Sequence, residues 1–231
     1  MQPADDFSAR RFLLEPTAEF PRLMAHPRYA GPVIMLALGT LALTLACFER
    51  MDYGWFSARL VATHPLLQHL GGAGLPKLDR QLVMAPAAIS AALKVVVGWI
   101  VVALYVGFLG AAARRPLKSR QALALAAWAQ VPYIVALVPS AINLATHGDG
   151  RLAPEQLDPT TFSALFGLQG TSFIDLLALH IGLADLWAWA LLVAGMCSAA
   201  GLHARVSVAA ICIPAVLFNV ALSLATMSFG L

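Results

Sequence analysis

Long apolar runs alternate with short polar segments along this chain. A helix needs about 20 consecutive apolar residues to cross the hydrocarbon core of a bilayer. The pattern predicts five such helices, in residues 30–48, 84–112, 121–144, 173–201 and 207–229. Backbone polar groups must pair within each span, because lipid offers them no partners. We therefore predict an all-α fold, a polytopic transmembrane bundle of five spans in a membrane domain of residues 30–231.

The composition agrees with a membrane protein. Hydrophobic residues make up 60% of the chain and charged residues only 12%, whereas about a quarter of the residues in a soluble domain are charged. The formal net charge is +3, and the basic residues lie in short loops rather than on one face. This distribution argues against a nucleic-acid partner. We expect membrane lipids, and other membrane proteins, as partners instead.

The basic residues between the apolar runs predict the orientation of the spans. The loop between the second and third runs contains four basic residues and no acid: Arg114, Arg115, Lys118 and Arg120. Such loops stay on the cytoplasmic side of a membrane. Residues 1–29 then form a cytoplasmic N-terminal segment. Five spans leave the C-terminus on the periplasmic side of a bacterial inner membrane. No small-residue cleavage site follows the first run, so we expect a retained anchor.

The two longer loops on the other side predict short interfacial helices. In residues 49–83, several apolar side chains share one face of a predicted helix: Trp55, Phe56, Leu60 and Val61. In the next loop, Asp158 followed by a proline is typical of a helix start. Ser172 and Asp175 have the spacing of a capping box. The fourth spanning helix is therefore expected to begin near Phe173.

The polar side chains in or beside the apolar runs give a candidate intramembrane polar site of Asp185, Lys94, Gln130 and His180. An ionisable group in lipid is costly and is a functional candidate by default. The Asp185 carboxyl must be protonated, paired or hydrated. Lys94 lies at a similar depth, so it either pairs with Asp185 or extends to the interface. Gln130 lies beside Pro132, which interrupts the backbone hydrogen bonds of the third span.

The sequence contains no pattern that indicates a metal site or a catalytic site. His180 precedes Asp185 by five residues, or about 140° around a continuous helix, so the two are not expected to share a face. His64, His69 and His147 fall on the same side of the membrane as His180, but without the spacing of a helical metal pair. The motifs HExxH and GxSxG and a phosphate-binding glycine loop are missing. We expect no metal, no cofactor, no catalytic residue and no enzymatic activity.

Three segments resemble the Yip family, the Ypt/Rab-interacting membrane proteins, in its bacterial branch. They are residues 15–27 (EPTAEFPRLMAHP), which lead into the first span, residues 128–133 (WAQVPY) and residues 181–196 (IGLADLWAWALLVAGM). The resemblance implies a five-span fold with a cytoplasmic N-terminus. Eukaryotic members are implicated in vesicle traffic and bind small GTPases. Bacterial members lack that machinery, so the resemblance implies a fold and a compartment rather than a reaction.

Two classes of function follow from these patterns. The first is a non-enzymatic membrane scaffold or interaction protein. The second is a small transporter or lipid-handling carrier that uses Asp185, with Lys94, Gln130 and the kinked third helix lining its path. Five spans are few for a monomeric transporter, so the second hypothesis predicts a homodimer.

Overall fold

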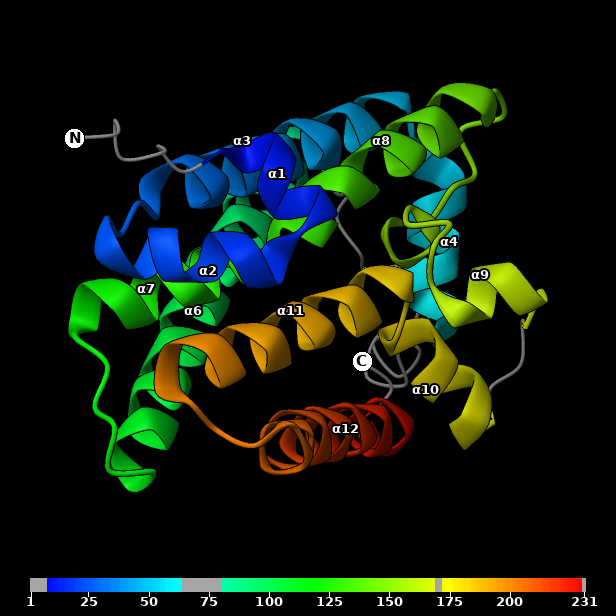
Figure 1. Ribbon diagram of the computed structural model, residues 1–231. Coiled ribbons are helices and arrows are strands. Elements are labelled where there is room, and N and C mark those ends of the chain that lie inside the picture. Colours follow the sequence, from blue (N-terminus) through cyan, green and yellow to red (C-terminus); the bar gives the residue numbers. More distant parts are fainter. Residues whose placement is uncertain (1–7, 64–79, 169–171, 230–231) are drawn as a thin grey trace. The chain divides into compact units, whose positions relative to one another are not determined.

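The structure, a computed structural model, describes residues 8–63, 80–168 and 172–229. These residues confirm the all-α class, and the part of the chain they cover contains helices, turns and one isolated antiparallel bridge but no strand. In chain order the helices are α1 Ala9–Leu14, α2 Pro16–Ala25, α3 Ala30–Arg50, α4 Tyr53–Thr63, α6 Arg80–Ala112, α7 Ser119–Ala129, α8 Val131–Thr146, the 3₁₀ turn η1 Pro154–Gln156, α9 Phe162–Phe166, α10 Phe173–His180, α11 Leu183–Ala200 and α12 Ala204–Phe229 (Figure 1).

In the described ranges, five helical segments are long and apolar enough to cross a membrane, as the sequence predicts. They are Ala30–Arg50, Arg80–Ala112, Ser119–Thr146, Leu183–Ala200 and Ala204–Met227. The third consists of α7 and α8, which are separated at Gln130, where the backbone N–H donates to the Ala127 carbonyl at 3.2 Å. Pro132 follows as the second residue of α8, a position where its missing N–H costs no helical bond.

The prediction of one continuous fourth helix over residues 173–201 is wrong. The helix begins at Phe173 as predicted, because the Ser172 hydroxyl accepts from the Asp175 backbone N–H at 3.2 Å. It ends at His180, and Ile181 is extended, with φ −120° and ψ 132°. The spanning helix α11 then begins at Leu183.

A tight backbone approach at Gly182 explains this break. The Phe162 N–H donates to the Ile181 carbonyl at 2.9 Å, and the Leu183 N–H donates to the Thr160 carbonyl at 3.0 Å. A Cβ atom on Gly182 would lie only 2.9 Å from the Thr160 carbonyl oxygen. Only glycine allows this approach, so a continuous apolar run contains a turn that hydropathy does not reveal.

The helix predicted to start at Asp158 starts later. Thr161 is the N-cap of α9, and its hydroxyl accepts from the Ala164 N–H at 3.3 Å. Asp158 closes a turn instead, because its Oδ1 accepts from both the backbone N–H and the hydroxyl of Thr160, at 2.8 and 2.7 Å. The helix predicted in residues 49–83 exists as α4, while the side chains of Leu60 and Val61, predicted to share its apolar face, lie outside the described set.

Two compact units make up the chain. The first contains Met1–Leu36, Lys94–Ile134 and Asp185–Val216, and the second contains Ala37–Leu93, Val135–Ala184 and Leu217–Leu231. The N-terminal segment, the α6–α7 loop and the α11–α12 loop therefore all belong to the first unit. The segments between α3 and α6 and between α8 and α11 belong to the second.

The N-terminal segment of the first unit is a folded cap rather than a polar tail. Phe12 of α1 and Phe20 and Leu23 of α2 are fully buried and join a core with Trp128 of α7 and residues of α6, α11 and α12. Figure 1 shows α2 beside α7. The Trp128 indole N–H donates to the Arg28 carbonyl at 2.6 Å. We refer to α1 and α2 as the N-terminal cap.

The core of the second unit joins the ends of its helices. Cys47, Phe48 and Met51 near the end of α3 pack with Leu144 of α8 and Leu152 of the following loop. These five side chains are buried. Their burial fixes the loop after α8 against the start of α4.

Candidate functional site

Asp185 lies in the first turn of α11, in the first unit, and is held by a tyrosine. The Tyr133 hydroxyl of α8 donates to Asp185 Oδ1 at 2.8 Å, across 52 positions of sequence. Asp185 is half-buried, so a neutral donor compensates a group that would be costly in lipid. Sequence reasoning did not identify Tyr133, and the only signal was a phenol one residue after Pro132.

Lys94 is not part of this contact. Its side chain is exposed on α6, and no ion pair joins it to Asp185 among the residues that the structure describes. The extension of Lys94 to the membrane interface therefore stays a prediction.

Gln130 lies at the break between α7 and α8, three residues before Tyr133. Its side-chain carbonyl oxygen is buried and has no hydrogen-bond partner within the described residues. An unsatisfied buried acceptor is unusual. Gln130 and Asp185 belong to the same unit.

His180 belongs to the second unit, whereas Asp185 belongs to the first. The angular argument for a continuous helix therefore does not apply to this pair, because α10 ends at His180. The Nε2 atom of His180 is buried without a partner in the described chain. Burial lowers the pKa of His180 below its usual 6.5, so the neutral ring is favoured.

Metal-ligand clusters are not found in the described ranges, where no three His, Cys, Asp or Glu side chains gather closely enough to hold an ion. His147 is exposed, and its ring Nδ1 lies 2.8 Å from the Asn143 carbonyl oxygen. His64 and His69 lie outside the described residues.

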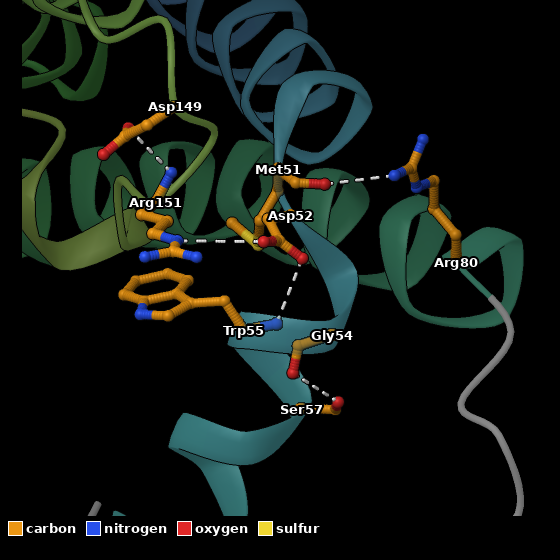
Figure 2. Close-up of polar contacts among 8 residues, drawn as sticks. All are labelled: Met51, Asp52, Gly54, Trp55, Ser57, Arg80, Asp149 and Arg151. Atoms are coloured by element: carbon orange, nitrogen blue, oxygen red, sulfur yellow. Dashed lines mark hydrogen bonds and ion pairs between the residues drawn. The ribbon is translucent and has the colours of Figure 1, made fainter.

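Four arginines of the second unit are engaged in internal contacts. Figure 2 shows Arg80 donating to the Met51 carbonyl, at 3.0 Å, and Arg151 paired with Asp52, at 3.8 Å. Arg59 forms an ion pair with Glu155 at 2.6 Å, and Arg50 donates to the Leu144 carbonyl at 3.1 Å. These four side chains hold the loops of this unit together.

The basic residues of the first unit are mostly free. An exception is Arg22, which pairs with buried Glu19 of the N-terminal cap. Nine further basic side chains are exposed and have no acidic partner in the described part of the chain: Arg10, Arg11, Arg28, Lys94, Arg114, Arg115, Lys118, Arg120 and Arg205. Free cations at the ends of spans are available to anionic lipid.

An apolar groove of about 740 Å³ lies along α11 and α12 in the first unit. Trp189 and Val193 of α11 and Val208 of α12 line it, and Thr17 and Ser198 add hydroxyl groups. Both helices are long and apolar enough to cross a membrane.

Five apolar helices of spanning length, found within the described residues, indicate an integral membrane protein. The chain belongs to the family of the Yip1 domain, whose model matches residues 10–225. This confirms the resemblance seen in the three sequence segments. The match begins in α1, so the N-terminal cap is part of the domain. No curated protein and no solved structure matches the chain.

Proposed function

We propose that this protein is a non-enzymatic scaffold of the bacterial inner membrane that holds other membrane proteins at the bilayer surface. The observation that supports it is the N-terminal cap, which is fixed by fully buried aromatic side chains and yet carries two exposed leucines. Leu13 is 42% exposed and Leu14 is 74% exposed. Both precede the first span, and in this proposal they contact a protein partner rather than lipid.

A rigid apolar pair outside the bilayer suits a protein partner. Covering Leu13 and Leu14 removes apolar surface from water, which favours association. The cap does not need to order on binding, because Phe12 and Phe20 already anchor it, and a preorganised surface loses less entropy when a partner docks. No catalytic step is assigned to the chain in this proposal.

Native mass spectrometry of the full chain, released from nanodiscs with its surrounding lipid, tests this function. We expect a stoichiometric protein partner that is lost when Leu13 and Leu14 are both replaced by Ala. The matched control replaces Leu104 and Leu217, which are 69% and 61% exposed within spans, and should retain the partner. Equal loss in both variants, or retention in both, would contradict a docking role for the cap.

A small transporter or lipid-handling carrier is the second candidate. The apolar groove beside α11 supports it, because Leu186, the neighbour of Asp185, is among its lining residues. A retained lipid or solute that is lost in Asp185→Asn, without any protein partner, would favour the carrier over the scaffold.

We further propose that the N-terminus is cytoplasmic and the C-terminus periplasmic. The free basic side chains of the first unit support this orientation, because unpaired Lys and Arg residues are retained on the cytoplasmic side. A C-terminal alkaline phosphatase fusion should be active and a C-terminal green fluorescent protein fusion dark. The reverse result would invert the orientation.

A further inference from the structure

A second, smaller pocket of about 360 Å³ lies in the first unit, away from Asp185. One wall comes from the end of α2 and the turn that follows it, and the other from the start of α7. The walls are formed by Met24, Ala25 and Pro27 on one side and by Lys118, Ser119 and Arg120 on the other. Its volume is within the range of small-ligand sites.

The side chain of Gln121, which also lines the pocket, ties its two walls together. Gln121 Nε2 donates to the Met24 carbonyl at 3.0 Å, and Gln121 Oε1 accepts from the Lys118 backbone N–H at 3.0 Å. One amide therefore bridges α2 and the α6–α7 loop. The pocket is consequently a fixed feature of the fold rather than a gap beside a loose loop.

The lining of the pocket is cationic. Lys118 and Arg120 are exposed and carry no acidic partner within the described residues, and none of the lining residues is an acid. The Ser119 hydroxyl adds a group that can donate or accept. Two cations and a hydroxyl on one wall suit an anion with several oxygen acceptors, such as a phosphate diester.

The position of the pocket identifies the source of that anion. Ser119 is the first residue of the third span, and Pro27 lies three residues before the first span, which begins at Ala30. Both walls therefore lie where spans leave the hydrocarbon, at the depth of the lipid headgroups. Two unpaired positive charges favour a headgroup with net negative charge over a zwitterionic one.

We propose that this pocket binds the headgroup phosphate of an anionic phospholipid of the surrounding leaflet. Lys118 and Arg120 contact the phosphate oxygens, and the apolar side chains of Met24 and Pro27 contact the glycerol and upper acyl carbons. This binding site does not depend on the scaffold role. The contrast with the second unit supports it, because the arginines there are already occupied by protein acceptors.

Lipid exchange followed by native mass spectrometry tests the site. The full chain is placed in nanodiscs of phosphatidylcholine with increasing phosphatidylglycerol, and the retained phosphatidylglycerol is counted. Replacing Lys118 and Arg120 together by Gln should weaken its retention about thirtyfold. The charge-preserving double variant, Lys118→Arg with Arg120→Lys, should retain it and shows that any loss follows charge rather than folding.

A matched control removes the same charge elsewhere in the first unit. Arg10 and Arg11 are exposed, unpaired in the described chain and outside the pocket, so Arg10→Gln with Arg11→Gln should leave retention unchanged. Equal weakening of phosphatidylglycerol retention in both double variants would show that diffuse attraction to the charged surface holds the lipid. That result would overturn the proposal. Full displacement of the lipid by millimolar glycerol phosphate would likewise overturn it, because the site would then serve a free anion.

Discussion

The Tyr133 hydroxyl lies 2.8 Å from Asp185 Oδ1 and joins α8 to α11 within the first unit. This contact changes the interpretation of the carboxyl group that the sequence singles out. A transport group needs a path and a changing partner, whereas Asp185 already has a fixed donor from the neighbouring span. The simplest role for the pair is to hold the third and fourth spans together.

Removing this donor should destabilise the protein. Tyr133→Phe deletes only the hydroxyl, and a hydrogen bond to a half-buried carboxyl group is worth roughly 1–3 kcal/mol. Thermal unfolding in detergent should show a lower Tm. Asp185→Asn keeps an acceptor and should cost less. The two changes together should be non-additive, because they remove the same contact, and additivity would show that the pair carries no coupling.

Lys94 provides the control for this double-mutant cycle of Tyr133 and Asp185. Because Lys94 is exposed and unpaired with Asp185, Lys94→Gln combined with Asp185→Asn should change Tm by the sum of the single effects, within about 0.5 kcal/mol. If the coupling energy between Lys94 and Asp185 were as large as that between Tyr133 and Asp185, it would support the Lys94–Asp185 ion pair considered from the sequence.

The spans could be predicted from sequence because their signal is local. The length and hydropathy of each apolar run are sufficient to predict a span. The helix start at Ser172 is recognised from residues 172–175 alone. The break at Gly182 could not be predicted, since it depends on the Thr160 carbonyl 22 positions away. Tyr133, the hydrogen-bond donor to Asp185, lies 52 positions away in the sequence and could not be predicted either. The N-terminal cap was missed because average polarity conceals the apolar positions Phe12, Phe20 and Leu23, which enter the core.

Glu19 should hold the N-terminal cap in place. It is 1% exposed, pairs with Arg22 and accepts from the Ser8 backbone N–H at 3.2 Å. Glu19→Ala leaves both donors without this partner, which should cost about 1–3 kcal/mol and loosen α1. Limited trypsin digestion should then cleave faster after Arg10. The exposed neighbour Glu15 is the matched control. If Glu15→Ala accelerated trypsin cleavage equally, Glu19 would have no special role in holding the cap.

Gly195 should be intolerant of a side chain. A Cβ at this position of α11 would lie 2.1 Å from Leu125 Cδ1 and 3.0 Å from Phe20 Cε1. Leu125 and Phe20 are fully buried, so they have little room to move, and Gly195→Ala should cost about 1–3 kcal/mol through overpacking. Gly98→Ala is the control, since no atom lies within 4 Å there. Its Tm should be unchanged or higher, because Ala favours helix.

His180 should make stability depend on pH. Burial lowers its pKa below 6.5 in the folded state, while the unfolded state titrates near 6.5. Below that pH the unfolded chain binds more protons than the folded one, so the free energy of unfolding should fall as the pH drops below 6.5 and level off once the folded pKa is passed. Above 6.5 the ring is neutral in both states and contributes no dependence.

The measurement is the change in Tm between pH 7.5 and pH 5.5. In His180→Leu the decrease should be smaller than in the wild type, because the titrating ring is gone while an apolar group occupies the buried position. His203→Gln removes an exposed histidine and should leave the wild-type decrease intact. If His180→Leu shows the full wild-type decrease, then the buried ring is not the group that titrates.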